Sequence, residues 1–145
     1  MSKFLEIDEL KIADQDLLVE TLEEDMEYWI GARGCTVESH TNPVYLLGYQ
    51  GDQRPEMAEV VIRREFVGEA SNDIGFKRQP NGNFRPIISE FDVEYYNQIW
   101  LDQLAQTYAE RKFVREMRES GYLLSSRVSS NDGSIEMSFT AQALL

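Results

Sequence analysis

The stretch Ile74-Gly-Phe-Lys-Arg-Gln-Pro-Asn-Gly-Asn-Phe-Arg-Pro-Ile-Ile88 gives the clearest indication of the fold in this chain of 145 residues. Its centre, Asn81-Gly82, accepts the positive φ angles that a tight turn requires. The flanking segments Ile74–Arg78 and Phe84–Ile88 are therefore predicted to form an antiparallel hairpin.

Further strands are predicted on both sides of this hairpin, from β-branched residues and from turn signals between them. The last two predicted strands are joined by Asn131-Asp132-Gly133, which favours a second hairpin. The remaining predicted strands are Phe4–Ile12, Val44–Tyr49, Ala58–Glu65, Tyr122–Val128 and Ile135–Phe139.

Two helices are predicted. Asp14 is suited to cap a short helix that carries an apolar residue at every fourth position, at Leu18, Leu22 and Met26. A longer helix is predicted from Asn97 to Ser120, with Leu104 and Tyr108 facing the sheet and Gly121 as its C-cap.

The predicted fold class is therefore α+β, with two helices on one face of a mostly antiparallel sheet, ferredoxin-like or a variant of it. With 42% hydrophobic and 28% charged residues, the composition is that of a globular protein. No linker or repeat divides the sequence, so residues 1–145 are expected to form a single domain.

The net charge of −12 is concentrated near the N-terminus, where ten acidic residues stand against Lys3 and Lys11 within the first thirty positions. A phosphate backbone would be repelled there, which disfavours general nucleic-acid binding. No apolar run approaches the roughly 20 residues that cross a bilayer. Cys35 is the only cysteine, so no intrachain disulfide can form, and the cytoplasm or a plastid stroma is the expected compartment.

Acidic residues crowd the end of the first predicted helix, where they oppose the helix dipole and one another. Three interpretations stay open: a solvated face that aids solubility, a docking face for a basic partner, and a divalent-metal site. The spacing is not that of a calcium-binding loop. The residues concerned are Glu20, Glu23, Glu24, Asp25 and Glu27.

The segment Gly48-Tyr49-Gln50-Gly51 lacks the Lys-Ser/Thr and the following helix of a phosphate-binding loop. It is interpreted as a strand end and a turn, with Tyr49 packed or presented at the surface. Tyr49 and Gln50 join the acidic residues as candidate partner-binding residues.

Cys35 and His40 could form a nucleophile and its base, or two ligands of a zinc site. Zinc would require two more strong ligands, and the sequence contains no other Cys or His. The favoured interpretation is an exposed histidine in a loop beside a partly buried cysteine. No catalytic residue, metal ligand or cofactor is assigned.

Basic and aromatic residues alternate over the middle strands, a pattern that some single-stranded RNA-binding sheets use. Acidic residues share these strands, so cross-strand ion pairs are the favoured interpretation. The residues are Arg63, Arg64, Lys77, Arg78 and Arg85 with Phe66, Phe76 and Phe84.

Six short segments, spread in order over nearly the whole chain, resemble the hypothetical chloroplast frame thirty-five family of plastids, cyanobacteria, other bacteria and phages. The chain departs from that family in a longer loop at Gly31–Pro43 and in Lys3, where the family has histidine. The matching segments are Met1-Ser-Lys-Phe4, Gly48-Tyr-Gln-Gly51, Ala58-Glu-Val-Val-Ile62, Asp73-Ile-Gly-Phe76, Tyr108-Ala109 and Asp132-Gly-Ser-Ile135.

The resemblance implies a fold and brings no reaction, because the family's function is unknown. Its genes often lie near that of a ring ATPase of the AAA class, which implies a partner. The sequence thus predicts a non-enzymatic protein-binding or adaptor domain. The alternative is a small metal-dependent enzyme or metal-binding module that uses the acidic cluster.

Overall fold

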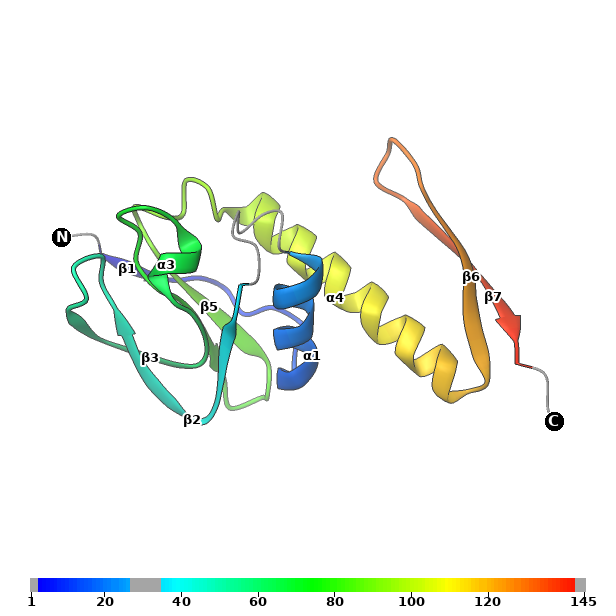
Figure 1. Cartoon of the computed structure of the whole chain (residues 1–145), viewed down its shortest axis with the longest axis horizontal. Coiled ribbons are helices and arrows are strands. Elements are labelled where there is room, and N and C mark those ends of the chain that lie inside the picture. The colour runs from blue at the N-terminus through cyan, green and yellow to red at the C-terminus, as the bar shows by residue number, and fades with distance from the viewer. Residues whose placement is uncertain (1–2, 27–34, 143–145) are drawn as a thin grey trace. The chain divides into compact units, whose positions relative to one another are not determined.

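The structure, a computed structural model, describes residues 3–26 and 35–142 and is shown in Figure 1. Its contacts divide the chain into two compact units, Met1–Tyr108 and Ala109–Leu145. The expectation of a single domain stays a prediction.

The N-terminal unit contains one five-stranded sheet in which every pair of neighbouring strands is antiparallel. The predicted hairpin is confirmed: Arg78 pairs with Phe84, and Gly82 takes a φ of 91° in the turn. Across the sheet the order is β1 (Phe4–Glu6), β5 (Phe84–Ser89), β4 (Ile74–Arg78), β3 (Gln53–Ile62) and β2 (Val37–Leu47).

The predicted α+β class is confirmed by this sheet and its helices. Strands β2 to β5 are neighbours in chain order, and β1 pairs antiparallel with β5 at the far edge. The ferredoxin-like variant is not confirmed by this order.

The first helix is α1 (Gln15–Glu20), which continues as the π-helical turn η1 (Thr21–Asp25). Asp14 caps it as predicted, because its Oδ1 accepts a hydrogen bond of 3.1 Å from the Leu17 amide. Leu18, Leu22 and Met26 are all fully buried, so the predicted apolar face is confirmed.

Helix α4 (Gln98–Glu119) starts in the N-terminal unit and buries Trp100, Leu101, Leu104 and Tyr108. The main core cluster contains these residues, the apolar residues of α1, and side chains of the sheet such as Phe76. Both helices therefore pack on the same face of the sheet, as predicted.

A smaller cluster lies on the opposite face of the sheet and includes Phe4, Leu46, Ala58, Val61 and Ile87. The backbone at Gly75 approaches it closely. A Cβ at this position would lie 2.8 Å from the Cβ of Ala58 and 2.9 Å from Cδ2 of Leu46. A side chain at position 75 would therefore force the neighbouring residues apart.

Three expected boundaries are corrected. Regular strand β1 ends at Glu6, although Ile7 and Leu10 still donate backbone hydrogen bonds to Pro86 and Phe84. The strand expected to reach Glu65 ends at Ile62, and Arg64–Val67 forms the short helix α3. The expected loop Gly31–Pro43 is strand β2 from Val37 onward, while residues 27–34 lie outside the described residues.

The C-terminal unit consists of the end of α4 and the hairpin of β6 (Tyr122–Ser129) and β7 (Ile135–Ala141). Gly121, with a φ of 91°, follows the helix as predicted, and the turn at Asn131-Asp132-Gly133 joins antiparallel strands as predicted. These two strands form a sheet of their own and do not join the five-stranded sheet.

Among the helices of the described residues, none is long and apolar enough to cross a membrane.

The orientation of α4, with Leu104 buried and Ile99 exposed, leads to a stability prediction. Leu104→Ala should lower the free energy of unfolding by about 2–4 kcal/mol, through lost transfer energy and a residual cavity, because Leu104 is fully buried. In the same urea titration, Ile99→Ala should cost less than about 0.5 kcal/mol, because Ile99 is 69% exposed on the same helix. Equal losses of unfolding free energy in the two variants would contradict this orientation of the helix.

Candidate functional site

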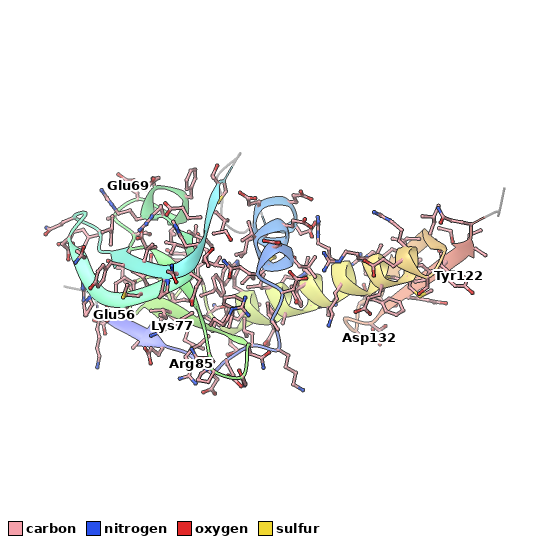
Figure 2. All side chains as sticks on the ribbon, turned by 90° about the horizontal axis from the view of Figure 1, so that it is seen from below. Glu56, Glu69, Lys77, Arg85, Tyr122 and Asp132 are labelled. Carbon is pink, nitrogen blue, oxygen red and sulfur yellow. The ribbon has the colours of Figure 1, made fainter. Side chains whose placement is uncertain are left out.

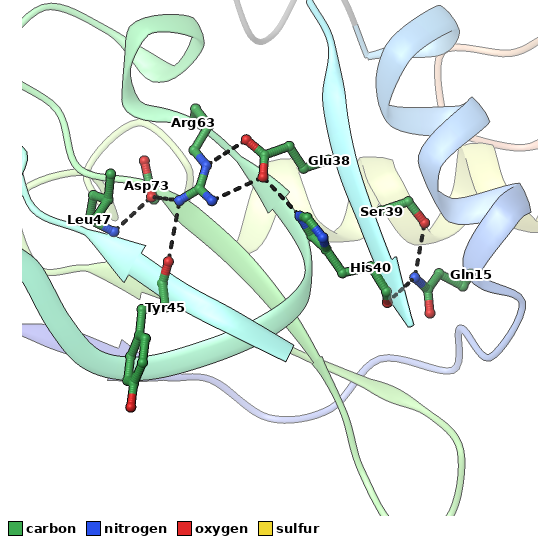
Figure 3. A network of polar contacts seen from close by, with 8 residues as sticks. All are labelled: Gln15, Glu38, Ser39, His40, Tyr45, Leu47, Arg63 and Asp73. Atoms are coloured by element: carbon green, nitrogen blue, oxygen red, sulfur yellow. Dashed lines mark hydrogen bonds and ion pairs between the residues drawn. The ribbon is translucent and has the colours of Figure 1, made fainter. Parts of the chain in front are cut away.

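Three charged residues from different segments meet beside strand β2 (Figure 3). Arg63 donates from Nε to Glu38 Oε2 at 2.6 Å and from Nη2 to Glu38 Oε1 at 2.9 Å, a bidentate pair. Its Nη1 donates to Asp73 Oδ2 at 2.7 Å. One guanidinium thus joins a carboxylate on β2 to another that directly precedes β4.

The carboxylate of Asp73 is completely shielded from solvent. Besides Arg63, it accepts hydrogen bonds from the backbone amides of Leu47 at 2.7 Å and Arg64 at 2.8 Å. Burial raises the pKa of Asp73, and these donors oppose that shift. The hydrogen bonds from Arg63 lower the pKa of Glu38, which is partly exposed.

His40 extends the network toward the surface, since its Nε2 lies 2.8 Å from Glu38 Oε1. It borders an open polar depression of about 420 Å³. The depression is lined by Asp14, Gln15, Asp16, Ser39, His40, Thr41 and Arg78.

The donors around this depression are already engaged within the protein. Gln15 Nε2 donates at 2.9 Å to both Ser39 Oγ and the His40 carbonyl. The Arg78 guanidinium stacks 4.4 Å above the Phe84 ring and donates to the carbonyls of Ala13 and Gly82. These contacts tie the start of α1 to β2 and to the β4–β5 turn, and they support a structural role.

Cys35 and His40 are not brought together in the way that a catalytic pair or a zinc site needs. His40 lies within β2 and not in a loop, which corrects the expectation, and Cys35 is buried in the main core. Cys35 and His40 are five positions apart, and five residues of nearly extended chain span about 16 Å, too far for the two side chains to act on one atom. Over residues 3–26 and 35–142, no three His, Cys, Asp or Glu side chains are grouped so that they could hold a metal ion.

The acidic residues predicted as a docking face have different surroundings. Glu23 is half-buried, and its Oε2 accepts a 2.9 Å hydrogen bond from the Val37 amide at the start of β2. Glu20 and Glu24 are exposed, and Glu27 lies outside the described residues.

Tyr49 and Gln50 occupy the turn between β2 and β3, which lies well away from α1 in Figure 1. Tyr49 is 38% exposed, and its hydroxyl accepts a hydrogen bond from Gln50 Nε2. The structure thus does not bring the two groups of predicted partner-binding residues together.

The aromatic residues of the proposed RNA-binding pattern do not face solvent as a group. Phe76 and Phe84 are fully buried in the main core. Lys77 and Arg85 are paired across β4 and β5 and lie next to one another in Figure 2. Bases could therefore not stack on these two aromatic rings.

Sequence reasoning missed an exposed apolar stretch that leads into α4. Phe91, Tyr95 and Ile99 are 48%, 76% and 69% exposed. They recur at four-residue intervals, a signal that is visible in the sequence. The buried residues Tyr96 and Trp100 are also four residues apart, each one position after an exposed residue. Periodicity alone therefore could not show whether Tyr95 and Ile99 or Tyr96 and Trp100 face the core.

This apolar stretch is held by a buried polar cluster. The Asp92 carboxylate accepts hydrogen bonds from the Asn72 amide at 2.9 Å and from Ser89 Oγ at 2.7 Å. The Asn72 side chain donates to Ser89 Oγ at 3.0 Å. Tyr96 donates from its hydroxyl to the Val67 carbonyl at 2.6 Å, and burial raises the pKa of Tyr96 to about 12. The backbone that presents Phe91 and Tyr95 is therefore fixed to the sheet.

Residues 33–138 match the sequence profile of a family described as protein of unknown function (DUF1257). No curated protein and no solved structure shows significant similarity to the chain.

The first prediction from the site concerns Arg63. Arg63→Ala should lower the free energy of unfolding by about 3 kcal/mol, because it leaves the buried Asp73 carboxylate without its counter-charge. Lys77→Ala, which removes an exposed charge on β4, should change it by less than about 0.5 kcal/mol. Adding Asp73→Asn to Arg63→Ala should recover part of the loss, and a purely additive double variant would contradict the coupling.

The second prediction concerns pH. Since folding lowers the pKa of Glu38, its contribution to stability is present above its ordinary value of 4.5 and is lost as pH falls through the lower folded value. The stability difference between wild type and Glu38→Gln should therefore be larger at pH 7 than at pH 3 in urea unfolding. A difference that is constant with pH would contradict this linkage.

Proposed function

The chain belongs to the DUF1257 family of proteins of unknown function, and we propose that it is a protein-binding adaptor. Its N-terminal unit would dock a partner through Phe91, Tyr95 and Ile99. The exposure of these three large apolar side chains is the observation that carries the proposal.

Exposed aromatic and aliphatic residues gathered in one short segment are typical of interaction sites, because burying them on a partner removes apolar surface from water. Tyr95, at 76% exposed, has most of its ring available to a partner. Tyrosine is also among the residues that most often dominate binding energy at interfaces.

Acidic residues surround this segment in the sequence and define the partner's chemistry. Glu90, Glu94 and Asp102 are all exposed. The first 108 residues contain nine basic and 21 acidic residues and thus hold the whole net charge of −12. We therefore expect a partner surface that combines apolar side chains with Lys or Arg, because opposite charges at the rim speed association.

The residues predicted from the sequence keep a secondary place in this proposal. Glu20, Glu23, Glu24 and Glu27 would attract a basic partner from a distance, and Tyr49 and Gln50 would contact it at a second point.

Buried hydrogen bonds support the proposal, because they already order the backbone that a partner would contact. Asp92, Asn72 and Ser89 already fix the backbone below Phe91 and Tyr95. A preorganised surface loses less conformational entropy when it binds, so more of the contact energy becomes affinity.

The resemblance to the hypothetical chloroplast frame thirty-five family points to the first partner to test, a ring ATPase of the AAA class. It also implies a cytoplasmic or plastid-stromal setting, in cyanobacteria, plastids, other bacteria or phages.

The test compares three forms of the immobilised protein for retention of an AAA-class ATPase from the same source. Tyr95→Ser/Ile99→Ser should weaken retention at least about tenfold, because the variant removes the central apolar contacts. Tyr45→Ser changes an aromatic residue that is 43% exposed on β2, and it should bind as wild type does. Wild-type retention should fall as salt is added.

Equal retention of the ATPase by all three forms, or retention by none, would contradict the proposal. The metal-dependent alternative makes a different prediction. Divalent cations would raise the melting temperature of the wild type, and Glu24→Gln would reduce that rise.

A further inference from the structure

Within its described residues, the C-terminal unit has no buried core of its own. Over residues 109–142 no side chain is buried, and large apolar residues stand open to solvent. Phe113, Tyr122 and Leu124 are 45%, 41% and 40% exposed, and Figure 2 labels Tyr122 on this hairpin. An isolated two-stranded sheet is at best marginally stable in water. The end of α4 packs on this one but leaves these apolar side chains partly exposed.

One face of β7 is apolar and lies against the end of α4. Phe113 and Phe139 contact each other edge to face, with ring centroids 5.4 Å apart. Arg127 Nε donates to Glu110 Oε2 at 2.8 Å on the same side. Met137 pairs with Arg127 on this face. Because side chains two residues apart along a strand share a face, Ile135 and Met137 lie on the same face of β7 as Phe139.

The outer edge of β7 is open and regular. Among the described strands, β7 pairs with β6 alone. The register shifts between Leu124 and Ser126, which places the extra residue of a bulge in β6 and leaves β7 unbroken. A bulged strand discourages edge pairing, whereas a regular exposed edge favours it.

The hydrogen bonds at the two ends of the hairpin show which amides face that open edge. Ser130 donates to the Ser134 carbonyl, and Gln142 donates to the Gly121 carbonyl. Because bonding alternates along an antiparallel strand, residues 136, 138 and 140 bond to β6. The amides of Met137 and Phe139 therefore point away from the hairpin.

The charge of the C-terminal unit favours a second copy of the chain as the occupant of this edge. Residues 109–145 contain five basic and five acidic residues and are neutral, whereas the rest of the chain carries −12. Two copies of this unit can thus approach without net repulsion. An antiparallel pairing of β7 with its own copy, centred on Ser138, sets Met137 opposite Phe139 and Glu136 opposite Thr140. In that register no charged residue faces its own copy.

We infer that this protein self-associates through the C-terminal unit, by two-fold antiparallel pairing of β7 with β7 of a second copy. The product is a four-stranded sheet whose apolar face carries Ile135, Met137 and Phe139 from both copies and is covered by two α4 ends. Such a two-layer unit buries the face that a single copy leaves partly open. The inference does not depend on the docking segment at Phe91, Tyr95 and Ile99.

Sedimentation velocity over about 1 μM to 1 mM tests the inference on the whole chain. The wild type should change from monomer to dimer over this range. Ser138→Lys sets like charges opposite each other across the two-fold axis, and it should weaken the dimer about fivefold. Ser126→Lys adds the same charge on the same face of β6, one strand further from the axis, and it should leave the dimer unchanged.

A charge-swap mixture makes the test specific to this register. Ser138→Glu alone should also dimerise weakly, whereas an equimolar mixture with Ser138→Lys should associate more tightly than either variant alone. A wild type that stays monomeric throughout would overturn the inference. So would a dimer that both Ser138 variants leave intact, or one that Ser126→Lys disrupts instead.

These outcomes can be separated from the test of partner binding. A monomeric protein that still retains its partner through Tyr95 and Ile99 would refute the pairing of β7 and leave the adaptor proposal standing.

Discussion

The N-terminal unit depends on how it compensates one buried charge, the carboxylate of Asp73. Removing an unpaired carboxylate from water costs far more than one contact can return, so the chain must supply donors from several segments. It does so with the Arg63 guanidinium and with the amides of Leu47 and Arg64. These hydrogen bonds fix the end of β2, the residues that follow β3 and the start of β4 around the Asp73 carboxylate. Glu38 accepts the hydrogen bonds from Nε and Nη2 of Arg63, and this bidentate pair anchors the first half of β2.

The sequence predicts the parts of this fold whose causes are local. Gly82 and Gly121 take positive φ angles, and Asp14 accepts a hydrogen bond from a helix amide three residues away, so each can be recognised from its immediate neighbours. The strand through Val37–Pro43 was missed, because its residues are mostly polar and include a proline. Its order comes from pairing with β3 and from Glu38, whose partner Arg63 is 25 residues distant. Separations of this kind leave no periodic signal in the sequence.

The same argument explains what was missed in the candidate site. Phe91 and Tyr95 were not predicted as exposed, because the segment before α4 carries apolar residues on both sides. Which side faces the core is decided by distant groups: Asp92 bonds to Asn72, and Tyr96 bonds to Val67. Sequence reasoning did identify the acidic surplus near the N-terminus, since charge needs no structure to be counted. It could not show that Glu23 is engaged with the Val37 amide.

The uneven distribution of charge connects the two proposals. The unit that would dock a basic partner holds the whole surplus of acidic residues, and the unit that would pair with its own copy is neutral. If the surplus were spread evenly, pairing would bring like charges together at the interface, and the docking surface would attract a basic partner less strongly. A dimer formed through β7 would carry two docking segments on one assembly. When one docking segment binds a partner with repeated subunits, the other is held near a second subunit at a high effective concentration. This raises the overall affinity although each single interface is unchanged. A ring-shaped partner is repetitive in this sense, so self-association and adaptor function would reinforce each other.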